Sequence, residues 1–304
     1  MRERLAVIDL GTNTFHLLIA ERENNKIHIL YREKQPVKIG LGGINQGLIT
    51  EEAVRRGILC LKKFSATLEE WKVARVQAFG TSALRSAING MEVVEKLKRE
   101  TGIETTLISG DEEAGYIYQG VRSALDLGAE KCLIVDIGGG SVEFIIGNNK
   151  QYYWKQSFDI GAQRLLELFR PHDPIHPEDV QLLEVHFKKS LMPLHDAMQV
   201  HNPRTLVGSS GTFDTLSEIY CERNQLPYFP DAGETPITLQ EYNKIHKELM
   251  YKNRAQRLQI PGMIEMRVDM IVVASCLVNY LLAIYAFHNI RVSSYSLKEG
   301  VLAS

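Results

Sequence analysis

The pattern of hydrophobic positions repeats between the two halves of the chain. Leu5–Ala20 reads LAVIDLGTNTFHLLIA, Leu133–Gly147 reads LIVDIGGGSVEFIIG, and the two segments align without a gap. In each, a short apolar run enters an Asp-x-Gly turn of small residues and continues as a second β-rich run, which is the pattern of a hairpin. The repeat therefore predicts two halves of related design, each organised around a β-hairpin.

One later segment is apolar enough to be tested as a membrane span. Met270–Phe287 contains no charged residue and lies near the lower limit of spanning length. Ser275, Asn279 and Tyr280 would each need a partner in lipid, and neither end carries a cluster of lysine or arginine. We therefore expect a buried helix of an α/β domain, with no membrane association.

Length and composition indicate two globular domains. The chain has 304 residues, of which 44% are hydrophobic and 24% charged. Lys and Arg total 35 against 37 Asp and Glu, for a net charge of -2, so whole-chain electrostatics do not favour binding to nucleic acid or an anionic membrane. The four cysteines show no close pairing and the apolar run before Asp9 is too short for a secretory signal, so we expect a reducing, cytoplasmic location.

The two hairpin turns have the composition of anion-binding loops. Glycine lets consecutive backbone N–H groups converge on one point, and short polar side chains add further donors. The residues of these turns predicted to bind phosphate are Gly11, Thr12, Asn13, Thr14, Gly138, Gly139, Gly140 and Ser141. Asp9 and Asp136, at the ends of the preceding strands, are placed to hold Mg²⁺ or Mn²⁺. Ordinary turns whose aspartates bind their own amides are the alternative, but repetition in register favours a phosphate site.

Two further segments run from an apolar stretch into a small-residue turn and then a helix. In Val76–Asn89, the helix-start amides, Ser82 and Arg85 are candidates to bind an anion; a solvated salt bridge of Arg85 is the alternative. In Thr205–Leu216 we expect the helix to begin near Thr212 or Phe213. The phosphate candidates of this segment are Gly208, Ser209, Ser210, Gly211 and Thr212, although such a turn taken alone is more often a tight connection.

The adjacent pair Glu112 and Glu113 has two different predicted roles. Ser109 followed by Glu112 fits a capping box, in which Glu112 turns back onto the Ser109 amide. Glu113 then points elsewhere, and the helix N-terminus keeps it ionised. We predict that Glu113 orients water for in-line attack on phosphorus. The alternative is that both glutamates only favour the helix dipole.

Glu143 follows the second turn and is a further candidate. The period-2 alternation of a strand places it on the same face as Ser141, whereas the aligned residue of the first hairpin is His16. Glu143 is predicted to orient the same water or to coordinate the metal, and a solvent-facing strand glutamate is the alternative.

Taken together, these segments resemble the ordered motifs of the exopolyphosphatase and guanosine pentaphosphate phosphohydrolase (Ppx/GppA) family. The motifs are Asp9–Thr14, Gly80–Arg85, Ile108–Ala114, Asp136–Glu143 and Gly208–Thr212, with later similarity at Ile160–Leu165, Ile260–Met263, Arg267, Asp269 and Ser296–Leu302. The resemblance implies an α/β fold that is actin-like, Hsp70-like and sugar-kinase-like (ribonuclease H-like). It has two domains, each with a mixed five-stranded sheet, and the two hairpins face each other across a cleft. It also implies hydrolysis of terminal phosphoanhydrides with a divalent metal, Glu113 as catalytic base, Glu143 assisting, and a homodimer.

The resulting hypothesis is a metal-dependent exopolyphosphatase. We place the domains at residues 1–125 and 126–304, with the last helix packing back on the first domain. Inorganic polyphosphate is the first expected substrate, and guanosine pentaphosphate (cleaved at its 5'-phosphate) or a nucleoside triphosphate is the alternative for the same site. A kinase with the same two hairpins and a ligand-gated binding protein are the more distant alternatives.

Overall fold

The structure, a computed structural model that describes residues 3–23 and 26–304, consists of two compact units. Met1–Glu113 and Ser304 form the first unit, and Ala114–Ala303 form the second. The division falls inside helix α4 (Gly110–Ala124), near its N-terminal end. The sequence-based domain limit at residue 125 lies just beyond the C-terminal end of the same helix.

The first unit contains one mixed sheet, with strand order β3-β2-β1-β4-β5. Its strands are β1 (Glu3–Leu10), β2 (Phe15–Glu23), β3 (Lys26–Gln35), β4 (Arg75–Gly80) and β5 (Thr105–Leu107). β1 and β2 form the predicted antiparallel hairpin, with Asp9 opposite His16. β4 and β5 run parallel to β1, so the chain leaves all three strands at the same edge of the sheet.

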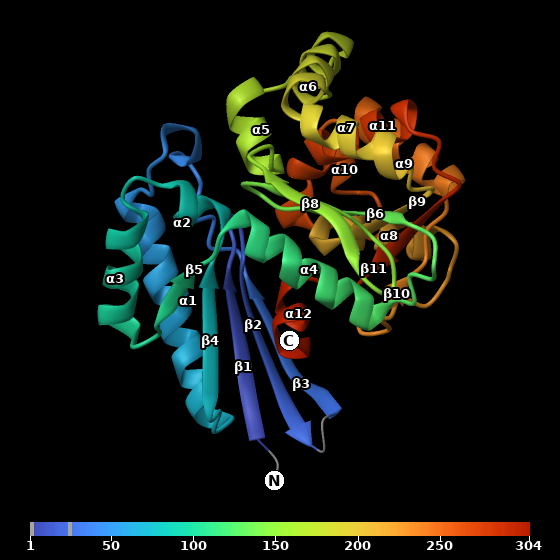
Figure 1. Ribbon diagram of the computed structural model, residues 1–304. Helices are drawn as coiled ribbons and strands as arrows, with labels where there is room; N and C mark the ends of the chain where they lie inside the picture. The colour runs from blue at the N-terminus through green and yellow to red at the C-terminus, as the bar shows by residue number, and fades with distance from the viewer. Residues whose placement is uncertain (1–2, 24–25) are drawn as a thin grey trace. The chain divides into compact units, whose positions relative to one another are not determined.

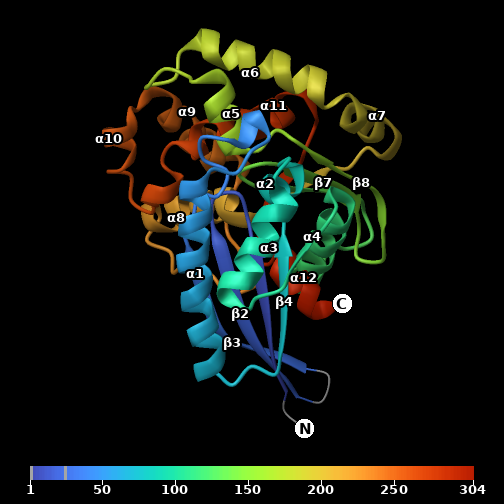
Figure 2. The ribbon, with the colours of Figure 1, turned by 90° about the vertical axis from the view of Figure 1, so that its left-hand side faces the viewer.

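Two long helices cover one face of this sheet (Figures 1 and 2). The helices of the unit are α1 (Glu51–Glu70), α2 (Ser82–Ser86) and α3 (Gly90–Thr101), and residues Ile44–Gln46 form a 3-10 turn. α1 begins at a Thr50 cap, whose hydroxyl accepts a hydrogen bond from the Ala53 amide at 3.2 Å. Its buried residues include Val54, Leu61 and Phe64, which share one helix face and pack on the sheet.

The second unit has six strands, in the order β10-β11-β9-β6-β7-β8. They are β6 (Cys132–Ile137), β7 (Val142–Gly147), β8 (Tyr152–Phe158), β9 (Thr205–Ser209), β10 (Glu234–Thr235) and β11 (Asn289–Ser293). Without the two-residue β10, the order and the strand directions repeat those of the first sheet. The predicted α/β class with two mixed sheets is therefore confirmed, with one short edge strand more than predicted in the second sheet.

Helix α11 is the centre of the second unit's helical layer. The helices of the unit are α5 (Ala162–Phe169), α6 (Pro177–Ser190), α7 (Met192–His201), α8 (Ser210–Arg223), α9 (Leu239–Tyr251), α10 (Arg254–Arg257), α11 (Met270–Ile284) and α12 (Leu297–Ala303), with a 3-10 turn at Glu265–Arg267. α11 packs against α5, α6 and α9, and most of its residues are buried. The predicted buried helix is confirmed, and within the described ranges no helix is both long and apolar enough to cross a membrane.

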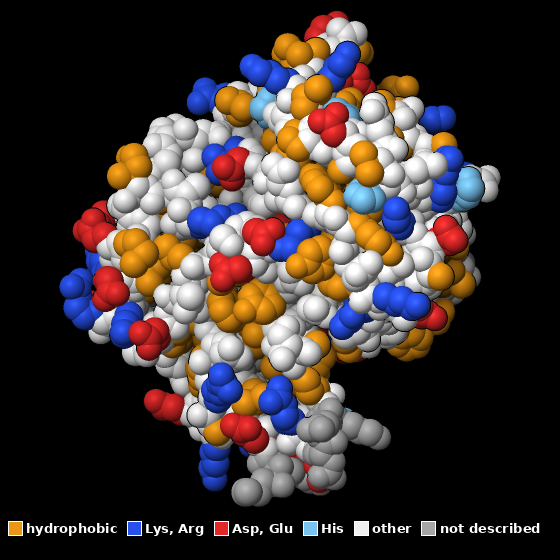
Figure 3. Space-filling view, in the orientation of Figure 1, with side chains coloured by type: hydrophobic (Ala, Val, Ile, Leu, Met, Phe, Trp, Pro, Cys, Tyr) orange, Lys and Arg blue, Asp and Glu red, His pale blue; other side chains and the backbone are white. Residues whose placement is uncertain are grey.

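Charged side chains of both signs are interspersed on the face of the molecule shown in Figure 3. This agrees with the near balance of 35 basic and 37 acidic residues. Attraction for an anion must therefore come from local groups rather than from a surface of one sign.

A polar network lies between α9 and α11 in the core of the second unit. The Tyr242 hydroxyl donates a hydrogen bond to the Ser275 carbonyl at 2.9 Å, and His246 Nδ1 lies 2.6 Å from Ser275 Oγ. Burial lowers the pKa of His246 to about 4, because the surrounding core disfavours the charged ring. His246 is therefore neutral in the folded protein at physiological pH.

We predict that His246 destabilises the folded protein in mild acid. Between its folded pKa of about 4 and the ordinary value of 6.5, the unfolded chain binds more protons than the folded chain, so stability falls as the pH drops through this range. At pH 4.5 the loss amounts to about 2 kcal/mol. Urea unfolding of the wild type and of His246→Gln at pH 7.5 and pH 4.5 measures it: the variant should lose about 2 kcal/mol less on acidification.

The matched control is His288→Gln, because His288 is an exposed histidine of the same unit. This variant should lose as much stability as the wild type between the two pH values. If His246→Gln also loses as much as the wild type, His246 does not cause the acid sensitivity.

Candidate functional site

The candidate residues of the first unit gather where the three parallel strands end. β1 ends at Leu10, β4 at Gly80 and β5 at Leu107. The Thr81 amide donates to the Leu10 carbonyl at 3.4 Å, and the Ile108 amide donates to the Gly80 carbonyl at 3.2 Å. The turn after β1, the start of α2 and the start of α4 therefore lie side by side, as expected for ligand-binding loops of an α/β sheet.

The hairpin turn of the first unit directs two backbone amides away from the segment 38–40, which binds the carbonyl groups of the turn. The Gly11 amide closes the turn by donating to the Thr14 carbonyl at 3.1 Å. The Thr12 carbonyl accepts from the Gly40 amide at 3.1 Å, and the Asn13 carbonyl accepts from the Lys38 amide at 2.8 Å. In a planar trans peptide the N–H points opposite to the C=O, so the Asn13 and Thr14 amides point away from residues 38–40. Two consecutive amides with this orientation can bind an oxyanion.

The turn of the second unit is built in the same way. The Gly138 amide donates to the Ser141 carbonyl at 3.0 Å, which matches the Gly11 bond of the first turn. The Gly138 carbonyl accepts from the Ala162 amide at 2.9 Å and the Gly139 carbonyl from the Gln163 amide at 2.9 Å. The Gly140 carbonyl accepts from the Gly161 amide at 3.2 Å.

The start of α5 therefore binds the carbonyl side of the second turn. By the same peptide geometry, the amides of Gly139, Gly140 and Ser141 point away from α5. This contact requires glycine at position 161, since a Cβ there would lie 2.4–2.5 Å from backbone atoms of Gly139 and Gly140. Each unit thus contains one turn whose amides point away from the backbone that binds its carbonyl groups.

Two buried carboxylates lie beside the second turn, and hydroxyl groups surround them. Asp136 and Glu143 are directly opposite each other on β6 and β7. Glu143 Oε1 accepts hydrogen bonds from Ser141 Oγ and Ser157 Oγ, both at 2.6 Å. Asp136 Oδ2 accepts from Ser209 Oγ at 3.0 Å and from Ser296 Oγ. Burial raises the pKa of Asp136, while the Ser296 and Ser209 hydrogen bonds act to lower it.

The two glutamates at the start of α4 have separate partners. Glu112 Oε2 accepts from the Ser109 amide and hydroxyl, both at 2.8 Å, and the Glu112 amide donates to Ser109 Oγ at 3.1 Å. The predicted capping box is therefore present. Glu113 instead binds Arg85, with Oε2 at 2.7 Å from Nη1, and both side chains are largely buried. Arg85 also donates to the Ile108 carbonyl at 3.0 Å, which fixes the guanidinium beside Glu113.

The third glycine segment differs in part from its prediction. α8 begins at Ser210, two or three residues earlier than predicted, and Ser210 has a φ of +71°. The first turn of α8 packs closely on Arg267, because a Cβ on Gly211 would lie 2.0 Å from the Arg267 guanidinium. Gly208 lies within β9, where the ring of Phe213 occupies the space of a side chain. The hydroxyl of Ser209, a residue predicted to bind phosphate, donates a hydrogen bond to the Asp136 carboxylate.

Arg267 is a site residue that the sequence identified only as part of a family-like segment. Its side chain is 7% exposed, and within the described part of the chain its Nε has no hydrogen-bond partner. Burial lowers the pKa of Arg267, while Asp214 and Asp136 act to raise it. A buried guanidinium between these acids and the start of α8 is a donor suited to an anion.

The sequence did not give the roles of three other residues. Ser157 had no signal, whereas Ser296 and Gly161 were identified only as parts of family-like segments. The fold brings the serines to Glu143 and Asp136, and it brings Gly161 into close contact with the second turn.

Comparison with known proteins gives consistent matches. The sequence profile of the Ppx/GppA phosphatase family matches residues 18–304. An exopolyphosphatase from Cytophaga hutchinsonii is 44% identical, with a TM-score of 0.96, over 99% of this chain and 96% of that chain. A Ppx/GppA family member from Aquifex aeolicus is 28% identical, with a TM-score of 0.80, over 100% of this chain and 97% of that chain.

We predict that Gly161→Ala disrupts the second turn. The added methyl group would overlap backbone atoms of Gly139 and Gly140, so the turn or α5 must move, at a cost of about 1–3 kcal/mol of stability. Pyrophosphate binding, measured by isothermal titration calorimetry, should weaken by about tenfold or more, because the amides of the turn lose their alignment.

Gly115→Ala provides the matched control. Among the residues that the structure describes, and apart from its own helix, a Cβ on Gly115 would have only Lys155 Nζ within 4 Å, at 3.9 Å. Alanine is also favoured over glycine within a helix. Pyrophosphate affinity should therefore stay within about twofold of wild type in this variant. Equal affinities in Gly161→Ala and wild type would contradict the assigned role of the turn.

Proposed function

The chain belongs to the Ppx/GppA phosphatase family and is a phosphoanhydride hydrolase, and from this premise we propose that it is an exopolyphosphatase that removes the terminal phosphate of inorganic polyphosphate. The observation that carries the proposal is the pair of turns whose amides point away from the neighbouring backbone. These amides bind phosphate oxygens and have no means of recognising a base. The similarity to the Cytophaga hutchinsonii exopolyphosphatase, at 44% identity, supports the same substrate.

Glu113 is the proposed catalytic base. It accepts a proton from water while the water oxygen attacks the terminal phosphorus, and the bond from that phosphorus to the bridging oxygen breaks. The departing chain, shorter by one phosphate, takes the bridging oxygen. Arg85 supports this role because its contact of 2.7 Å holds the Glu113 carboxylate in one orientation.

Each unit has carboxylates beside its turn that are suited to a divalent metal. Asp9 in the first unit, and Asp136 and Glu143 in the second, offer carboxylate oxygens, and such hard oxygen ligands are those that Mg²⁺ and Mn²⁺ bind. The hydroxyl groups that bind Asp136 and Glu143 fix the orientation of these carboxylates. When bound, such an ion neutralises charge on the phosphate groups.

The proposed enzyme works as a homodimer in the cytoplasm and acts on phosphate chains rather than nucleic acid. Cys60, Cys132, Cys221 and Cys276 are all buried and free. Burial raises the pKa of Cys60, Cys132 and Cys276 to about 12, so these thiols remain protonated and unreactive. Such cysteines fit a reducing compartment.

We predict that Glu113→Gln lowers the rate of phosphate release by about 10²–10⁴-fold, because glutamine cannot accept the proton from water. The side chain keeps its size and can still accept a hydrogen bond from Arg85, so the fold is retained. Phosphate release from polyphosphate in the presence of Mg²⁺, with circular dichroism as a check of folding, measures the effect.

The neighbouring residue provides a matched control. Glu112→Gln removes a carboxylate one position away, and glutamine also satisfies the capping box. Its rate should stay within about threefold of wild type. If both variants keep the wild-type rate, or lose it equally, Glu113 is not the base.

A single assay distinguishes the candidate substrates. We expect phosphate release from polyphosphates of graded length to exceed that from guanosine pentaphosphate or ATP, compared by kcat/KM, because the amide-lined turns recognise phosphate alone. Guanosine pentaphosphate as the best substrate would assign the 5'-phosphohydrolase activity instead. ADP formed from ATP only after addition of a sugar or carboxylic acid would indicate a kinase.

A further inference from the structure

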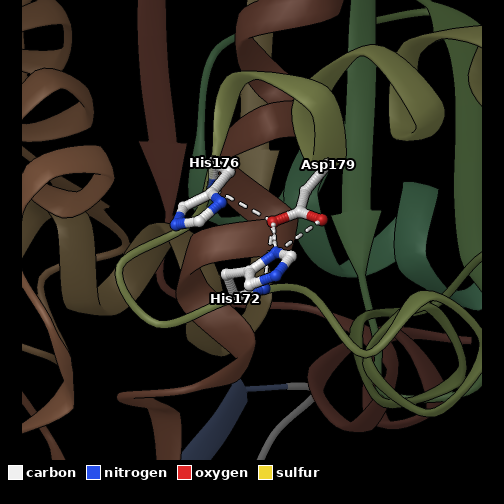
Figure 4. A group of neighbouring side chains, drawn as sticks. All are labelled: His172, His176 and Asp179. Atoms are coloured by element: carbon white, nitrogen blue, oxygen red, sulfur yellow. Dashed lines mark hydrogen bonds and ion pairs between the residues drawn. The ribbon is translucent and has the colours of Figure 1, made fainter.

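A cluster of metal-ligating side chains lies in the second unit, outside the residues assigned to phosphoanhydride hydrolysis. The segment between α5 and α6 brings His172 and His176 next to Asp179 in the first turn of α6 (Figure 4). One nitrogen of each ring and one carboxylate oxygen all lie within 4.8 Å of one another. Both histidines are exposed, whereas Asp179 is buried, so an ion in solvent can reach the cluster.

Asp179 is a fixed anion at the centre of this cluster. Its Oδ2 accepts hydrogen bonds from the His172 amide at 2.9 Å and from the His176 amide at 3.0 Å. These two hydrogen bonds hold the carboxylate beside the backbone of both histidines.

The two imidazole rings lie beside this carboxylate. They stack in parallel, with centroids 4.0 Å apart and an interplanar angle of 3°, so one ring must leave the stack before both can bind the same ion. His172 Nδ1 lies 3.2 Å from Asp179 Oδ1 and 3.0 Å from Oδ2. The hydrogen bond to Asp179 accounts for the position of the His172 ring, and the second exposed ring adds a further nitrogen donor at the same place.

We propose that His172, His176 and Asp179 form a binding site for a transition-metal ion of the Zn²⁺ type. Imidazole nitrogen with one carboxylate suits Zn²⁺, Co²⁺ and Ni²⁺, whereas Mg²⁺ prefers oxygen alone. Ligand atoms about 2.0–2.1 Å from a tetrahedral ion are about 3.4 Å apart. The donor atoms lie within 4.8 Å of one another, so they must approach by up to about 1.4 Å, and the His176 ring must turn. His172 Nδ1 and Asp179 Oδ1 already have this spacing.

Binding requires two local changes, a proton shift on His172 and a rotation of the His176 side chain. The ion takes the place of the hydrogen between His172 Nδ1 and Asp179, and the ring carries its proton on Nε2 instead. His176 turns on its exposed side chain to supply the second nitrogen, and water completes the coordination. The bound ion then joins the segment before α6 to the first turn of that helix and stabilises both.

Cobalt provides a direct test, because tetrahedral Co²⁺ bound through nitrogen has visible absorption bands that indicate its ligands. The full chain is titrated with Co²⁺ in the presence of excess Mg²⁺, which occupies oxygen-only sites, and Zn²⁺ is then added as a competitor. We expect one Co²⁺ per chain, displaced by Zn²⁺, and a rise in melting temperature with Zn²⁺. His172→Ala and His176→Ala should each weaken binding by at least about tenfold and abolish the rise.

The control variant is His288→Ala, which removes an exposed histidine elsewhere in the unit and should bind Co²⁺ as the wild type does. The two cluster variants should keep Mg²⁺-dependent phosphate release, which separates this site from the proposed catalytic residues. The proposal is overturned if the wild type binds no Co²⁺ or Zn²⁺ in excess Mg²⁺, or if the cluster variants bind as tightly as His288→Ala.

Discussion

The hydrogen bonds to the carbonyl groups of the two hairpin turns determine which way the backbone amides of these turns point, and therefore which groups a ligand can bind. In the first unit the amides of Lys38 and Gly40 bind the turn's carbonyls, and in the second unit the first residues of α5 do so. A peptide whose carbonyl is held in one direction must present the next amide in the other. The segments that bind the two turns differ, but their effect is the same. Each turn presents a row of amides on the side opposite to the segment that binds its carbonyl groups.

Each unit uses its sheet to place further groups beside the turn. Three parallel strands end at one edge, so the segments that follow them must be neighbours. In the first unit this edge brings Arg85 to Glu113, and in the second it brings Ser209 and Ser296 to Asp136. The repeated strand order explains how one arrangement can serve different chemistry, because the scaffold is shared while the side chains after each strand differ.

The sequence predicted the features that depend on local pattern. Apolar periodicity and the Asp-x-Gly turns predicted both hairpins, and the spacing of Ser109 and Glu112 predicted the capping box that separates Glu112 from Glu113. Contacts between residues distant in the sequence could not be predicted in this way. Local pattern does not link Ser296 to Asp136, and it does not show that Arg267 packs against Gly211.

The carboxylates of the two units have different kinds of partner, and this difference fits their proposed roles. Glu113 is paired with a guanidinium, which compensates its charge and fixes its direction. Asp136 and Glu143 accept hydrogen bonds from serine hydroxyls, while the positive charge of Arg267 acts on Asp136. Both serine bonds to Asp136 go to Oδ2, and both serine bonds to Glu143 go to Oε1. In each carboxylate the serines therefore fix the orientation through one oxygen and leave the second oxygen to another partner, as a metal ligand requires.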